Sequence, residues 1–107
     1  MTSMYLDDER HPKTERDWFI VRTYNEALQY IVSHDCPSYI SFDHDLGTEK
    51  TGYDFAKALV EFDLDSNMSY IPEDFEFNVH SANPVGRDNI RMYLTTYLEM
   101  RKRSKNG

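Results

Sequence analysis

The feature that most constrains the fold is a regular alternation of strand-like and helix-like segments. Residues 18–24, 38–42 and 75–82 are short stretches rich in β-branched and aromatic side chains, and each precedes a segment with helical spacing of its apolar residues. Strands separated by helices predict parallel pairing, because the chain must cross the sheet before it forms the next strand. Ser3–Leu6 is predicted as a further strand, followed by a polar loop.

Helix boundaries are indicated by capping residues. Thr23 followed by Glu26 is typical of a capping box, and this helix is expected to end near Ser33. A second helix is predicted over residues 51–62. Asn83 and Pro84 have the order of an N-cap and a first helical residue, and the last helix is expected to run from there to about residue 103.

Length and charge limit the function classes. At 107 residues, the chain is predicted to form one domain, residues 1–107, with one core. Its formal net charge of −7 argues against duplex nucleic acid as a partner. The basic tail, residues 101–107, is interpreted as a solvated helix end, in preference to a nucleic-acid arm. The sequence does not indicate an oligomeric state.

Cellular location is predicted from the single cysteine and from hydropathy. Cys36 is expected to be a buried structural thiol, and one cysteine allows no disulfide within the chain. No segment is apolar and long enough to span a membrane or to serve as a secretory leader. These features predict a soluble cytoplasmic protein with no membrane partner.

Polar clusters follow three of the predicted strands. Each cluster alone is more typical of a turn, a cap or a hydrogen-bonded structural residue. If the strands are neighbours, however, all three clusters meet at the carboxyl edge of the sheet, where parallel α/β proteins bind ligands. Acidic groups in such proximity favour Mg²⁺ or Mn²⁺ as a cofactor, and nearby histidines favour Mn²⁺. The clusters are Asp7-Asp8, Asp43-His44-Asp45 and His80-Ser81.

The stretches "YLDD", "FDHDLGTEKTGYDFAKAL" and "NVHSANP" resemble the receiver domain of response regulators. In that resemblance, Asp7 and Asp8 match the acidic pair, Asp43 matches the phosphoacceptor, and Ser81 matches the conserved hydroxyl. The resemblance implies a small receiver-like (flavodoxin-like), three-layer α/β domain with a mostly parallel four-stranded sheet. The usual first helix and fifth strand are absent, and the lysine of that strand is absent with it, which argues against ordinary phosphosignalling.

A closer similarity is to the cyclic-phosphate processing receiver family of bacteria and phages, carried by "LDDER", "DHDLG", "TGYD" and "HSANPVG". It covers about residues 4–90. The resemblance implies metal-dependent hydrolysis or other processing of a small anionic cyclic phosphate, such as a cyclic nucleotide or a nucleotide-derived signal.

The expected site residues fall into three groups. Metal ligands are expected at Asp7, Asp8 and Asp43. Catalytic residues are expected at His44, His80 and Asp45, with imidazoles suited to proton transfer near neutral pH and the order of acid and base left open. Phosphate-binding residues are expected at Arg10, which follows the first strand, and at Ser81, Asn83, Gly86 and Arg87, around the start of the last helix.

Two alternatives to the enzyme remain open. One is a non-enzymatic receiver relative that binds a metal, a phosphorylated ligand or a protein. The other is an acidic inhibitor of a host protein. The paired histidines favour the enzyme, since metal binding alone does not require them.

Overall fold

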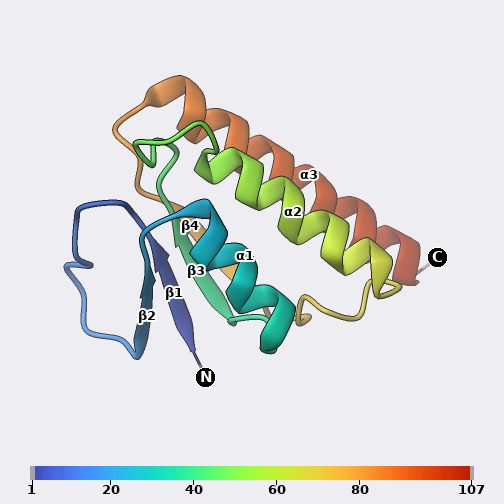
Figure 1. Ribbon diagram of the computed structural model, residues 1–107. Helices are drawn as coiled ribbons and strands as arrows, with labels where there is room; N and C mark the ends of the chain where they lie inside the picture. Colours follow the sequence, from blue (N-terminus) through green and yellow to red (C-terminus); the bar gives the residue numbers. More distant parts are fainter. Residues whose placement is uncertain (1, 107) are drawn as a thin grey trace.

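Four short parallel strands form the centre of the fold. The structure is a computed structural model that describes residues 2–106. Strands occur in the order β2-β1-β3-β4, and every neighbouring pair is parallel (Figure 1). The strands are β1 (Ser3–Leu6), β2 (Trp18–Val21), β3 (Tyr39–Phe42) and β4 (Glu76–Val79), and the helices are α1 (Tyr24–Ser33), α2 (Gly52–Asp65) and α3 (Pro84–Asn106).

This arrangement confirms the predicted fold, a small receiver-like α/β domain with a four-stranded parallel sheet, and within residues 2–106 it has neither a helix between β1 and β2 nor a fifth strand. The strands are shorter than the β-rich stretches suggested. Residues beyond Val21 leave the sheet because Thr23 caps α1, its hydroxyl accepting a hydrogen bond from the Glu26 amide at 3.1 Å. The predicted cap therefore sets the end of β2 as well as the start of α1.

All three helices lie against one face of the sheet. Met4, Leu6, Ile40 and Phe42 point to this face and are fully buried in a single core with residues of α1, α2 and α3. The crossings from β2 to β3 and from β3 to β4 step in the same direction, so right-handed connections place α1 and α2 on the same side.

The opposite face carries a loop in place of the helix that a three-layer arrangement would have there. The connection from β1 to β2, residues 7–17, steps in the other direction across the sheet. A right-handed crossing therefore takes it over the opposite face. This segment is polar and irregular, so the face is covered only in part (Figure 1).

The end of α3 corrects one expectation. Residues 102–105 are exposed, as expected of a solvated helix end, but Arg101 is only 3% exposed, and its Nη1 lies 3.1 Å from Oδ2 of the buried Asp63. The Tyr97 hydroxyl donates to the same oxygen at 2.6 Å. This buried pair holds the helix against the end of α2, and α3 continues to Asn106.

The Cys36 thiol and the hydropathy of the helices can be compared with the expectations from the sequence. Burial, followed by the negative charge of Asp63, raises the pKa of the Cys36 thiol to about 12, which fits a structural role. Within residues 2–106, no helix combines the length and apolar character needed to cross a bilayer.

Candidate functional site

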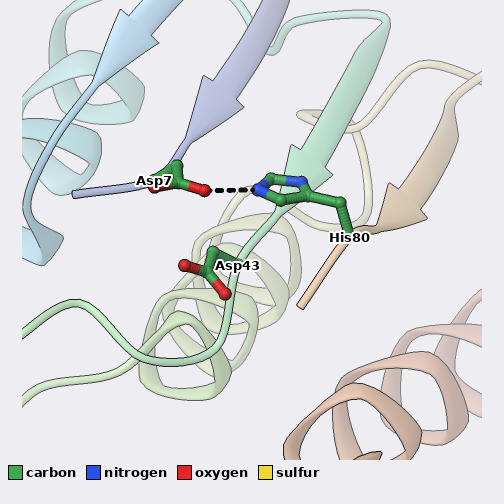
Figure 2. A group of neighbouring side chains, drawn as sticks. All are labelled: Asp7, Asp43 and His80. Atoms are coloured by element: carbon green, nitrogen blue, oxygen red, sulfur yellow. Dashed lines mark hydrogen bonds and ion pairs between the residues drawn. The ribbon is translucent and has the colours of Figure 1, made fainter. Parts of the chain in front are cut away.

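Three ionisable side chains converge at the carboxyl ends of β1, β3 and β4. Asp7, Asp43 and His80 follow these neighbouring strands, and one potential ligand atom from each lies within 4.8 Å of the others (Figure 2). The convergence follows from the strand order, since Leu6 pairs with Phe42 and Phe42 pairs with Val79. We call these three residues the acidic cluster.

Asp7 is held as a carboxylate although it is only 1% exposed. Its Oδ1 accepts hydrogen bonds from the amides of Glu9 and Arg10 at 2.9 and 2.8 Å. Its Oδ2 lies 3.0 Å from Nε2 of His80 and 3.1 Å from Nε of Arg10. Burial raises the pKa of Asp7, but the two amides and His80 outweigh that cost, and the pKa lies below its ordinary value.

The pKa of Asp43 is shifted in the opposite direction to that of Asp7. Burial and then the negative charge of Asp7 raise its pKa above the ordinary value, although the Ser81 hydroxyl and the His44 amide oppose the shift. Arg10 is the one arginine or lysine among residues 2–106 that approaches both carboxylates; it is 51% exposed, and its Nη2 lies 3.7 Å from Asp43 Oδ2.

The cluster therefore fits a divalent cation. Two buried carboxylates that repel one another are stabilised by positive charge between them. Carboxylate oxygens together with an imidazole nitrogen form a donor set suited to Mn²⁺ and related ions, and the carboxylates alone suit Mg²⁺. Arg10 supplies part of that charge in this structure, and its exposure leaves it room to move.

The His80 ring is fixed on three sides. Its Nδ1 lies 2.7 Å from the Ser41 hydroxyl, its Nε2 contacts Asp7, and its ring stacks on Tyr5 with centroids 4.5 Å apart and planes inclined by 3°. Ser41 and Tyr5 were not identified from the sequence as site residues. The available signal was a polar serine inside the otherwise apolar strand "SYISF".

His44 and Asp45 form a second pair next to the cluster. Nδ1 of His44 lies 2.9 Å from Asp45 Oδ1, and this hydrogen bond lowers the pKa of the exposed Asp45. The His44 amide donates to Asp43 Oδ1 at 2.9 Å, which ties the pair to the cluster. Asn83 Nδ2 reaches Asp45 Oδ2 at 3.4 Å.

Gly86 makes room for the His44 ring. A Cβ atom on Gly86 would lie 2.3 Å from His44 Cγ, so no larger residue fits while the ring keeps this position. Gly86 is itself buried, and its amide donates to the Asn83 side chain at 3.1 Å, the N-cap bond expected for α3. The glycine that was expected to receive a phosphate thus lies beneath an imidazole in this structure.

The other predicted site residues divide by position. Ser81 is buried beside Asp43, and its hydroxyl accepts from the Asn83 amide at 3.1 Å. Asp8 lies near Gly47 instead: a Cβ on that glycine would be 3.1 Å from Asp8 Oδ2. The Arg87 Nε lies 4.0 Å from Asp88 Oδ1, and among the described residues its guanidinium has no contact with the cluster.

Two supporting residues emerged only from the structure. Gly52, within the "TGYD" stretch, allows α2 to approach the backbone that carries the site, because a Cβ there would lie 1.7 Å from the Asp43 carbonyl oxygen. Arg22 donates through Nη1 to the carbonyl oxygens of Asp7 and Arg10, at 3.0 and 2.6 Å. It fixes the start of the loop that carries Arg10.

One of the comparisons with known proteins identifies a family. Residues 2–96 match the family described as the cyclic-phosphate processing Receiver domain. No curated protein and no solved structure matches the chain. The family match covers most of the chain and includes every strand, the site residues and the start of α3. This chain therefore belongs to the cyclic-phosphate processing receiver domain family.

Proposed function

We propose that this protein is a metal-dependent phosphodiesterase that hydrolyses or otherwise processes a small cyclic phosphate. The observation that carries the proposal is the convergence of Asp7, Asp43 and His80 at one edge of the sheet, with candidate ligand atoms within 4.8 Å of each other. Membership of a family described as cyclic-phosphate processing supports the substrate class.

In this proposal, Asp7, Asp43 and His80 would hold the ion, whereas the carboxylate of Asp8, the residue after Asp7, lies near Gly47. A bound Mg²⁺ or Mn²⁺ supplies positive charge at the phosphate and makes a coordinated water more acidic. Arg10, which already lies close to both carboxylates, turns to bind a phosphate oxygen by charge-assisted hydrogen bonds. The Ser81 hydroxyl, which hydrogen-bonds Asp43 in this structure, is proposed to turn its proton to a phosphate oxygen.

His44 and Asp45 are proposed to move protons. When Nδ1–H of His44 donates to Asp45, the ring's Nε2 becomes the nitrogen that accepts a proton. The carboxylate also orients the ring and stabilises its protonated form, as in other carboxylate–histidine pairs. His80, fixed between Ser41 and Asp7, is proposed to bind the ion, which leaves proton transfer to His44.

Arg87 and the start of α3 are proposed to bind the substrate's phosphate from the side of Asn83. The supporting observation is the position of Asn83, which contacts both Asp45 and the first turn of α3. The amide of Gly86 is already used by the cap, so Arg87 is the group with capacity for a new bond.

The decisive experiment incubates the protein and Mg²⁺ or Mn²⁺ with 2′,3′-cyclic nucleotides, 3′,5′-cyclic nucleotides and cyclic oligonucleotides, and separates the products by chromatography. Asp43→Asn is the inactive reference, and Asp65→Asn, which neutralises an exposed aspartate at the end of α2, is the matched control. Ring opening by the wild type and the control, but not by the reference, supports the enzyme. Ligand binding without any product favours the non-enzymatic alternative.

A further inference from the structure

A groove lies on the face of the sheet opposite the helices, between the strands and the loop of residues 7–17. Its volume is about 400 Å³, within the size range of small-molecule sites. Its aromatic lining consists of Tyr5, Trp18 and Tyr39, which come from three adjacent strands. The Tyr5 and Trp18 rings meet edge to face at 5.5 Å, and the Trp18 and Tyr39 rings are 5.9 Å apart. We call this space the open-face groove.

The charge of the groove differs from that of the chain. The protein has 19 acidic and 12 basic residues, yet no Asp or Glu is among the described residues that line the groove. Arg10, His11 and Lys13 line it from the loop. A groove without acids in an acidic protein favours an anionic ligand over a cationic one.

The groove is continuous with the acidic cluster. Arg10 and His80 line the groove and also contact Asp7. The His80 ring stacks on Tyr5, so a ligand whose phosphate is bound at the cluster has an aromatic surface directly beside it. Because the groove adjoins the cluster, the group attached to the substrate's phosphate is the part that reaches the groove.

The lining already accepts a flat group. The guanidinium of Arg16 lies over the Tyr39 ring at 4.1 Å from its centroid. Arg16 is exposed, so it is free to be displaced or to cover a ligand from the other side. Asn78 adds an amide that can donate and accept hydrogen bonds at a base edge, and its Nδ2 lies 3.4 Å from the Ser41 hydroxyl.

We infer that the open-face groove binds the nucleobase of the substrate, so that the protein acts on a cyclic nucleotide with its phosphate at the acidic cluster and its base stacked near Tyr39 and Trp18. The inference rests on the proposed function for the position of the phosphate. Base stacking on aromatic side chains tolerates any base, so the groove selects for the presence of a base more than for its identity.

Trp18 gives a direct readout, because it is the only tryptophan of the chain and lines the groove. Protein in Mg²⁺ is titrated with adenosine 2′,3′-cyclic phosphate, and in parallel with ethylene phosphate, a cyclic phosphodiester that has no base. The nucleotide is expected to change Trp18 fluorescence saturably. Ethylene phosphate is expected to leave the fluorescence unchanged and to compete with the nucleotide only weakly.

Two substitutions at Tyr39 isolate the stacking contribution. Tyr39→Leu keeps an apolar side chain but loses the aromatic face, and it should weaken nucleotide binding roughly 5- to 150-fold, the range for loss of one stacked base. Tyr39→Phe should keep wild-type affinity. Tyr93→Leu is the matched control, because Tyr93 is a half-buried tyrosine that packs on Tyr53 of α2, on the other side of the sheet.

The possible outcomes test nucleobase binding in the groove separately from the proposed reaction. Tyr39-dependent nucleotide binding without turnover supports the groove and contradicts the proposed reaction. Turnover of nucleotide and ethylene phosphate with equal kcat/KM, unaffected by Tyr39→Leu, supports the reaction and overturns the groove. A nucleotide that leaves Trp18 fluorescence unchanged, or that binds Tyr39→Leu as tightly as wild type, also overturns the inference.

Discussion

Metal binding should be visible as a gain in thermal stability that depends on Asp43. An ion that binds only the folded protein stabilises it by about 2.7 kcal/mol when its concentration is 100 times Kd. For a chain of 107 residues, the entropy of unfolding is roughly 0.2 kcal/mol/K. Saturation with Mn²⁺ should therefore raise Tm by about 12 °C relative to protein in EDTA.

Asp43→Asn should remove most of this gain and should not destabilise the metal-free protein. Asparagine has nearly the same shape but no charge, and Asp43 is a group whose folded pKa is raised by burial and by Asp7. The ionised form of such a group costs stability at neutral pH. In EDTA, the variant should melt at a temperature equal to or above that of wild type.

The raised pKa of Asp43 also determines how the stability difference between Asp43→Asn and wild type depends on pH. The advantage of Asp43→Asn should be complete above the raised folded pKa of Asp43, and it should vanish as the pH falls below the unfolded value near 3.9. Asp7 has a lowered pKa, so its ionisation stabilises the fold above its unfolded pKa, and Asp7→Asn should lower Tm at neutral pH.

Differential scanning calorimetry between pH 3 and 7.5, with EDTA or millimolar Mn²⁺, measures all of these quantities. Asp88→Asn is the control for loss of a surface charge, and Asp8→Asn should keep most of the gain because its carboxylate lies near Gly47. The reasoning is refuted if Mn²⁺ leaves the wild-type Tm unchanged at millimolar concentration. It is also refuted if Asp43→Asn responds to Mn²⁺ as wild type does.

Three further predictions concern catalysis and the fold. His44→Ala should reduce kcat by ~10²–10⁴-fold but keep the Mn²⁺-dependent gain in Tm. His80→Ala should reduce kcat and also reduce that gain in Tm. If the two variants behaved equally in calorimetry, the assigned roles would be contradicted. Gly86→Ala should reduce kcat as His44→Ala does, because the new methyl group displaces the His44 ring. Its Tm should stay near the wild-type value, because alanine suits a helix. Full activity would show that the ring position is not needed. Arg101→Ala should lower the free energy of unfolding by about 3–5 kcal/mol in urea titrations, since it leaves the buried Asp63 carboxylate without its cation, and a loss below 1 kcal/mol would argue against that pair.

Local sequence patterns were sufficient to predict the elements of the fold. Ser3–Leu6 was predicted with its observed bounds, and the caps at Thr23 and Asn83 are those of α1 and α3. Caps and strands are detectable in this way because they depend on residues within a few positions of each other. The ends of β2 and α3 were less predictable, since they depend on competition with a cap and on a distant ion pair.

Part of the candidate site was also accessible from the sequence. Polar residues directly after strands must gather at one edge if the strands are parallel neighbours, and Asp7, Asp43 and His80 do so. The carboxylate of Asp8 and the guanidinium of Arg87 were expected in the same place. Their positions depend on side-chain orientation in loops and on the surface of a helix, which chain order does not specify.

What the sequence alone determined is the set of chemical groups and the strand ends that carry them, because both are local properties of the chain. Only the tertiary structure decided which of those groups share a site and in which direction the pKa of each is shifted. Burial raises the pKa of both carboxyls, but hydrogen bonds from the Arg10 and Glu9 amides and from His80 leave the pKa of Asp7 lowered, whereas the charge of Asp7 raises that of Asp43 further, although the two are the same residue type. The absence of a helix between β1 and β2 was evident from the short connection, but the groove that results depends on where the loop of residues 7–17 lies against Tyr5, Trp18 and Tyr39. Such contacts join residues far apart in the chain, and their geometry is fixed only when the sheet has formed.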